Sequence, residues 1–300
     1  MGRRRGEWPA EPEALPGPVV DNHTHLESIS EVLEPGVADP GVAAQLQRAA
    51  ALGVEAVVQI GCDLDSAEVS VRWAHEHPQL VAGVAIHPNE AVLHAGVREI
   101  APDGLEPAPL PRHARSLDDA IARIAELARD ERVRTVGETG LDFFRAGEQG
   151  RAVQRESFRV HIALAKELGL PMQIHDRDAH ADVLDVLTRD GAPDVTVFHC
   201  FSGDAEMAAE CARRGYYLSF AGPVTFGSAD EVRAAAAVVP ASQLLVETDA
   251  PYLTPAPHRG APNAPYLLPI TVRRLAEVRG DDLGALCRQL RETSRSLYGV

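Results

Sequence analysis

Short apolar segments typical of β-strands alternate with helical segments along almost the whole of this chain. Eight strands are predicted, with the bounds Val19–His23, Val54–Gly61, Leu80–Ile86, Val133–Glu138, Leu170–His175, Val195–His199, Tyr216–Ala221 and Leu244–Asp249. Helices are predicted at 42–52, 67–77, 120–129, 154–168, 181–189, 207–214 and 232–239, and from residues 270 and 283 onward. Such alternation favours a parallel sheet with right-handed crossovers, and the count of eight favours a closed TIM (β/α)8 barrel over an open sheet.

The length of 300 residues suits a single barrel domain, which we predict for residues 19–300. The first eighteen residues, MGRRRGEWPAEPEALPGP, begin basic but have no apolar segment behind the arginines. A secretory or twin-arginine signal needs that segment, so residues 1–18 are expected to be a disordered extension and the protein is expected to be cytoplasmic. No apolar run approaches the ~18 residues of a membrane helix, so no membrane association is expected.

The net charge is −15, and Lys166 is the single lysine among the 29 basic residues. An acidic chain is a poor generic binder of nucleic acid, because affinity for the phosphate backbone comes from cations that release counterions. This weighs against a DNA-coating role but leaves a nuclease in which metal ions or a few arginines supply the positive charge. Four cysteines lie far apart with no C-x-x-C pair, which predicts buried reduced thiols.

Histidine and acidic side chains stand where the predicted strands end. His23 and His25 lie two residues apart, so both imidazoles can point to the same side of the first strand. Later strand ends supply five more such side chains, namely His87, Glu138, His175, His199 and Asp249. The active site of a TIM barrel is built at the C-terminal ends of its strands, so these side chains are expected to converge there as a metal site.

Six of these side chains are the predicted metal ligands, namely His23, His25, Glu138, His175, His199 and Asp249. Six ligands exceed what one structural zinc needs, about four, and imidazole with carboxylate suits zinc, manganese or iron better than calcium. We therefore expect two divalent ions per chain (Mg, Mn or Zn) that share a carboxylate and a water. Two ions, two carboxylates and a bridging hydroxide leave a net charge of about +1 to hold a phosphate oxygen.

Five motifs carry a family resemblance, and they occur in the order Asp21-Asn22-His23-Thr24-His25-Leu26, Val136-Gly137-Glu138-Thr139-Gly140-Leu141-Asp142, His175-Asp176-Arg177-Asp178-Ala179, His199-Cys200-Phe201-Ser202-Gly203 and Glu247-Thr248-Asp249-Ala250-Pro251. Together they closely resemble the TatD-type metal-dependent hydrolases, a branch of the amidohydrolase-like barrels, over roughly Val19 to Pro265. The resemblance implies a TIM barrel, a divalent-metal centre and DNase or related phosphodiesterase activity.

Carried onto matching positions, the resemblance implies a role for each ligand. One metal ion would be held by His23, His25, Glu138 and Asp249, and the second by Glu138, His175 and His199. Glu138 and Asp249 are the expected catalytic residues, with Asp249 also accepting a proton from metal-bound water.

Four side chains are the predicted substrate contacts, namely His87, Arg177, Arg259 and Asn263. Arg259 and Asn263 resemble the family's Arg-Gly-x-x-Asn-x-Pro segment, and the arginines could grip phosphates bidentately. Asp21 and Asp142 are expected to orient ligands or loops. The chain departs from the family pattern at Asn89, at Ala264 and in an insertion over 98–115, which is expected to act as a lid.

The resulting hypothesis is a two-metal hydrolase of phosphodiesters, in which a metal-bridging hydroxide attacks the phosphodiester. The enzyme would be a 3′-to-5′ exonuclease-like DNase that shortens nucleic-acid ends. Nucleic-acid ends or another small phosphodiester are the expected partners, with no obligatory protein partner. One alternative is hydrolysis of another ester or amide, such as an aminoacyl-RNA ester, because the same hydroxide could attack it. The other is a non-catalytic metal-binding protein, against which the intact ligand set argues.

Overall fold

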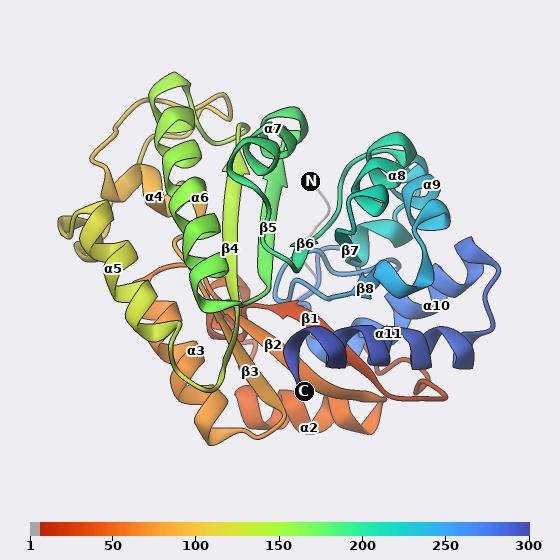
Figure 1. Ribbon diagram of the computed structural model, residues 1–300. Helices are drawn as coiled ribbons and strands as arrows, with labels where there is room; N and C mark the ends of the chain where they lie inside the picture. Colours follow the sequence, from red (N-terminus) through yellow and green to blue (C-terminus); the bar gives the residue numbers. More distant parts are fainter. Residues whose placement is uncertain (1–6) are drawn as a thin grey trace. The chain divides into compact units, whose positions relative to one another are not determined.

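The structure is a computed structural model, and it describes residues 7–300 (Figure 1). Its eight strands are β1 (Val19–Thr24), β2 (Val54–Gly61), β3 (Leu80–Val84), β4 (Val133–Asp142), β5 (Met172–Arg177), β6 (Thr196–Phe198), β7 (Tyr217–Phe220) and β8 (Leu244–Val246). They form one sheet in chain order, β1 to β8, with parallel pairing. Helices alternate with the strands, so the predicted TIM (β/α)8 topology is confirmed.

The helices of residues 7–300 are α1 (Ile29–Val32), α2 (Val42–Ala51), α3 (Leu64–Glu76), α4 (Pro88–His94), α5 (Leu117–Leu127), α6 (Glu148–Leu168), α7 (His180–Asp190), α8 (Ala205–Arg213), α9 (Asp230–Val238), α10 (Leu268–Arg279) and α11 (Leu283–Tyr298). Short 3-10 turns complete the chain, among them η2 (Pro111–Ala114) and η5 (Pro265–Leu267). No helix in the described part of the chain is long and apolar enough to cross a membrane.

The chain divides into two compact units. The first comprises the residues up to Gln59, His77–Val81 and His199–Val300, and the second comprises Ile60–Glu76 and Ala82–Phe198. The first unit therefore contains β1, most of β2, β7 and β8, whereas the second contains β4, β5, β6 and the end of β3.

In the first unit, the two ends of the strand order meet. β1 pairs with β2, β7 pairs with β8, and a parallel bridge joins Thr24 to Ala250 just after β8. The helix α11 packs against β1 and β8, and its buried face includes Leu286 and Leu290. Every residue of β1 is buried, including the polar ones, which is the pattern of a strand covered on both faces.

In the second unit, β4 pairs with β5 and the long helix α6 packs along β4 (Figure 1). The helix ends at Gly169, which adopts the left-handed conformation common after helices. The strand β4 runs four residues beyond its predicted end at Glu138. Gly140 makes this continuation possible, because its φ is +142° and a Cβ there would lie 2.1 Å from the carbonyl oxygen of His175.

The amino-terminal segment differs from the disordered extension expected for residues 1–18. Residues 1–6 lie outside the described residues, but those that follow contact other segments of the first unit, to which they belong. The Trp8 indole donates to the Ala38 carbonyl, the Tyr266 hydroxyl donates to the Pro9 carbonyl, and Leu15 is buried. The apolar and aromatic side chains in this Pro-rich stretch explain why it docks. All four cysteines are free, as predicted, although only Cys211 and Cys287 are fully buried.

Candidate metal centre

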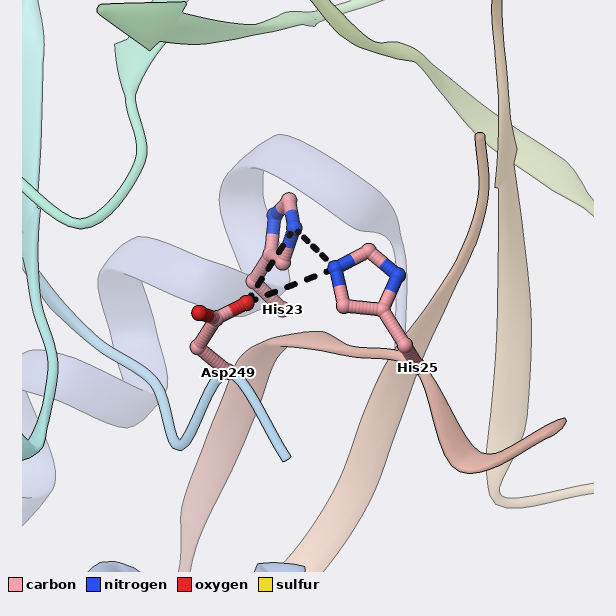
Figure 2. Close-up of side chains that lie close together, drawn as sticks. All are labelled: His23, His25 and Asp249. Atoms are coloured by element: carbon pink, nitrogen blue, oxygen red, sulfur yellow. Dashed lines mark hydrogen bonds and ion pairs between the residues drawn. The ribbon is translucent and has the colours of Figure 1, made fainter. Parts of the chain in front are cut away.

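The side chains of His23 and His25 converge at the end of β1, in the first unit. Both residues are buried, and their positions two apart place the imidazoles on the same side of the chain. Figure 2 shows the two rings turned toward each other, with the two Nε2 atoms 3.1 Å apart. Only one proton can lie between two nitrogens at this distance, so the pair is suited to share a cation.

Asp249 completes this cluster from the segment after β8. Its amide donates to the His23 carbonyl at 3.0 Å, and its φ of +54° lies in the left-handed region that a non-glycine residue rarely adopts. This backbone brings Oδ1 to 3.3 Å from His25 Nε2 and 4.0 Å from His23 Nε2 (Figure 2). Two imidazole nitrogens and a carboxylate oxygen are a donor set for zinc, manganese or iron, so these residues fit a divalent metal ion.

His199 stacks on His23 in the same unit, with ring centroids 4.0 Å apart and an interplanar angle of 14°. Its Nδ1 lies 3.2 Å from Oε1 of the fully buried Glu247, which also accepts from the Cys200 amide. A carboxylate only accepts, so this contact places the ring proton on Nδ1 and assigns the ligating role to Nε2. Sequence reasoning gave Glu247 no role, although its position two residues before Asp249 is a usable signal.

Asp21 supports the cluster through Thr248, the residue that precedes Asp249. The Thr248 amide and hydroxyl donate to its carboxylate at 2.9 and 2.6 Å. Complete burial raises the pKa of Asp21 to about 8, and the hydrogen bonds from Thr248 oppose that rise. Asp21 thereby holds the residue that precedes Asp249, in the orienting role expected for it.

In the second unit, Glu138 of β4 forms a cluster with two histidines. His175 of β5 places Nδ1 at 2.5 Å from Glu138 Oε1, and His87 places Nε2 at 3.6 Å from the same oxygen. His87, expected as a substrate contact, thus lies among potential metal ligands. Its Nδ1 accepts from the Asn89 amide at the start of α4, a helix that the sequence analysis did not predict.

Asp142 orients His175, as expected. Glu138 and Asp142 lie four residues apart on β4 and face the same side, and Asp142 Oδ2 is 3.2 Å from His175 Nε2. Burial raises the pKa of Asp142, but the hydrogen bond and charge of His175, with Asn89 and His87, outweigh this and lower it to about 2. Both ring nitrogens of His175 therefore face carboxylate oxygens. The ligand atoms of His87, Glu138 and His175 lie within 4.8 Å of one another, so this cluster also fits a divalent ion.

Cys62 is a further neighbour of Glu138 that sequence reasoning missed. It follows β2, and its thiol donates to Glu138 Oε2 at 3.4 Å. The residue is partly exposed rather than buried as expected. Its position directly after a strand is the same signal that identified the other side chains at strand ends.

The predicted substrate residues lie in different settings. The guanidinium of Arg177 stacks on the Phe144 ring and that of Arg259 on the Phe226 ring, each at 4.1 Å, and both arginines are exposed. Asn263 is fully buried, and its amide donates to the Thr248 and Tyr252 carbonyls. Asn263 therefore braces the loop around Asp249, and we do not retain it as a substrate contact.

Comparison with known proteins gives a consistent result. The family model described as TatD related DNase matches residues 20–299. An uncharacterized metal-dependent hydrolase TatD from Mycobacterium tuberculosis is 46% identical over 87% of this chain and 90% of its own length. A protein from Enterobacter lignolyticus named 3′-5′ ssDNA/RNA exonuclease TatD is 31% identical over 86% of this chain and 92% of its own length.

Among solved structures, the TatD homologue YJJV from Escherichia coli K12 superposes with a TM-score of 0.78 at 25% identity, covering 94% of this chain and 98% of that one. The relative from Mycobacterium tuberculosis is named as a metal-dependent hydrolase, and the clusters described above consist of side chains that can hold a metal ion. The chain belongs to the TatD-related DNase family and is a metal-dependent hydrolase with a TIM-barrel fold.

Proposed function

We propose that this hydrolase cleaves phosphodiester bonds at the 3′ end of single-stranded nucleic acid. The observation that carries the proposal is the convergence of His23 Nε2, His25 Nε2 and Asp249 Oδ1, three metal-ligand atoms held by buried backbone. The nucleic-acid substrate and the polarity are supported by the relative named as a 3′-5′ ssDNA/RNA exonuclease.

Two divalent ions are proposed per chain, with the ligands that the family resemblance implies. His23, His25, Glu138 and Asp249 would hold one ion, and Glu138, His175 and His199 the other. Support comes from within each unit, where the side chains present nitrogen and oxygen atoms to one another. The contact of His199 Nδ1 with Glu247 supports Nε2 as the ligating nitrogen of that ring. His175 lies between Glu138 and Asp142, which supports its place next to the shared carboxylate.

Bound divalent ions would supply Lewis acidity and a nucleophile at neutral pH. The role of the protein side chains is to orient the ligands and to take up a proton. Asp249 suits the second task because its side chain is 12% exposed, so the carboxylate can reach both the ligand cluster and the solvent. The hydrogen bond from the Asp249 amide to the His23 carbonyl keeps the Asp249 carboxylate next to His25.

A cavity of about 290 Å³ beside this cluster is the proposed site for the terminal nucleotide. Its lining includes Tyr252, Phe226 and Arg259. The Tyr252 ring centroid lies 6.0 Å from that of His25, and Tyr252 is 43% exposed, so a base can stack on it. Arg259, fixed on Phe226, carries a charge that can bind the adjoining phosphate.

Metal removal and replacement test the proposal. The protein is stripped with a chelator, and hydrolysis of single-stranded DNA labelled at the 5′ or the 3′ end is followed after adding magnesium, manganese or zinc. We expect no cleavage without metal, and stepwise shortening of the 5′-labelled strand from its 3′ end after metal is restored. Absence of cleavage with every ion, in protein that still binds metal, would contradict the nuclease assignment and favour another ester or amide as substrate.

A further inference from the structure

A second cluster of metal-ligand side chains lies in the second unit, on the segment that follows β3. Glu90 and His94 occupy positions i and i+4 of α4 and therefore share one face of that helix. His113 approaches them from η2, within the insertion over 98–115. The ligand atoms of these three side chains lie within 4.8 Å of one another. None of the three belongs to the candidate metal centre described above.

His94 presents a buried nitrogen without a partner. Its Nδ1 lies 2.9 Å from the Arg115 carbonyl oxygen, and because a carbonyl only accepts, Nδ1 carries the proton. Burial lowers the pKa of His94, and the Arg115 carbonyl only partly opposes this. Nε2 therefore carries a lone pair and no proton. It makes no hydrogen bond to any residue from 7 to 300, although His94 is buried, with only 5% of its surface exposed. Buried polar atoms are rarely left in this state, so the lone pair points to a missing ligand.

His113 offers the second nitrogen. Its Nδ1 accepts from the Leu110 amide at 2.7 Å, so Nε2 carries the ring proton and donates to Glu90 Oε2 at 2.8 Å. A metal ion at Nε2 would displace this proton, which can move to Nδ1 and keep the ring neutral. The move breaks the hydrogen bond from the Leu110 amide, which lies in a segment where the Leu110 residue is 49% exposed.

Arg112 balances the charge around the cluster. Its guanidinium donates to Glu90 at 2.8 Å, and it also pairs with Asp63 at 3.3 Å and with Asp65 at 3.6 Å. The two aspartates can hold the guanidinium without Glu90. The Glu90 carboxylate is thus available as a metal ligand, and a divalent ion would neutralise the charge that the group of acids leaves in excess.

We propose that Glu90, His94 and His113 form a zinc site that ties the insertion to α4. Two imidazoles and one carboxylate are an established zinc ligand set, and a water would complete the tetrahedron. The ion would satisfy the His94 lone pair and join two segments separated by an irregular stretch. Because α4 begins next to His87, the site would also fix the helix that adjoins the Glu138 cluster.

Zinc stoichiometry tests this site directly. Chelator-treated protein is dialysed against buffered nanomolar free zinc, and zinc per chain is measured by mass spectrometry of the metal. We expect His94→Gln and the isosteric Glu90→Gln each to bind one zinc ion fewer per chain than the unaltered protein. The matched control is His75→Gln, which changes an exposed histidine of α3 outside the cluster and should bind as much zinc as the unaltered protein.

Two further measurements separate loss of the site from loss of the fold. Circular dichroism should show the same helix content in all variants, and zinc should raise the melting temperature of His75→Gln more than that of His94→Gln. The same deficit of one ion should appear when His94→Gln is combined with His175→Ala, whatever the latter does to the proposed catalytic centre. Equal zinc content in folded His94→Gln, Glu90→Gln and unaltered protein would overturn the site and leave a hydrogen-bonded latch.

Discussion

At the scale of single residues, the cluster in the first unit depends on where one carboxylate is placed. Asp249 adopts a left-handed backbone conformation, which costs an ordinary L-residue on the order of 1 kcal/mol. Hydrogen bonds hold the loop in that form: one runs from the Asp249 amide to the His23 carbonyl, one joins Thr248 to Asp21, and one is donated by the Asn263 side chain. Backbone outliers of this kind cluster at functional sites, which supports the proposed role of Asp249.

Replacing Asp249 with Asn should lower kcat for single-stranded DNA by about 10²–10⁴-fold, because the amide cannot take up the proton. KM should change little, because the shape of the side chain is kept. The measurement is steady-state kinetics on the end-labelled strand. Asp230→Asn, at an exposed position on α9, is the control and should keep the original rate. A kcat for Asp249→Asn within threefold of the control would remove Asp249 from the proposed mechanism.

Sequence alone predicts which residues would serve as metal ligands but not the atoms they present. The two-residue spacing of His23 and His25 predicted that they share a face, and the structure brings their Nε2 atoms together. The choice between Nδ1 and Nε2 in His199 depends on Glu247, which is distant in sequence from the ring it contacts. The same holds for Asn263, whose burial depends on packing that no local pattern encodes.

At the scale of elements, His161 links α6 to Ile86, which lies two residues after the end of β3. The ring is fully buried, accepts from the Ile86 amide at Nε2 and contacts the Ser157 carbonyl through Nδ1. The contact at Nε2 requires the neutral ring, because a protonated Nε2 could not accept from the Ile86 amide. Burial lowers the pKa of His161 to about 4 from 6.5, and the hydrogen bond that Nδ1 donates to the Ser157 carbonyl partly opposes this. The unfolded chain therefore binds the proton more readily than the folded one.

This difference predicts a pH-dependent stability. The contribution of His161 is fully present above pH 6.5 and is lost as the pH falls toward 4, in total about 3 kcal/mol at 1.36 kcal/mol per pH unit. Between pH 7.5 and pH 5 the loss should be about 2 kcal/mol. Urea unfolding of the unaltered protein and of His161→Gln at both pH values measures it, because the stability gap between them should narrow by that amount. An unchanged gap would show that His161 does not titrate on unfolding.

Element positions were predictable where apolar periodicity was strong. The eight strands were found with small shifts, but β4 continues to Asp142 because Gly140 lets the chain pass close to His175, which depends on the neighbouring strand. The helix α4 was missed because it is short and begins at a His-Pro pair that resembles a turn. Its N-terminal cap is the His87 side chain, an unusual acceptor in that position.

At the scale of the whole molecule, the net charge of −15 limits how the substrate can be bound. The proposed phosphate contacts are Arg177 and Arg259, and for single strands each neutralised phosphate contributes a slope of about −0.7. We therefore expect log(kcat/KM) to fall against log[salt] with a slope of about −1.4 at fixed metal concentration. Arg259→Gln should make the slope shallower by about 0.7. A slope as steep as −5 would reveal a cationic surface that the proposal lacks.

The TIM-barrel topology was predictable for a different reason than the site. The count and order of strands are recorded in the chain as a whole, and one misplaced boundary does not alter them. The amino-terminal segment was not predictable from its composition, because its few docking side chains, Trp8 and Leu15, are surrounded by Pro, Glu and Gly. Charge and proline suggested disorder, whereas contacts with distant helices decide the outcome.

That docked segment makes one thiol a natural reporter. Gly17 lies against Cys287 of α11, so close that a side chain on Gly17 would touch the cysteine's Cβ at 3.5 Å. Burial raises the pKa of the Cys287 thiol, which keeps it protonated and slow to react while the segment is in place. The rate at which Cys287 is alkylated can therefore report how fast the amino-terminal segment detaches, with no label added to the chain.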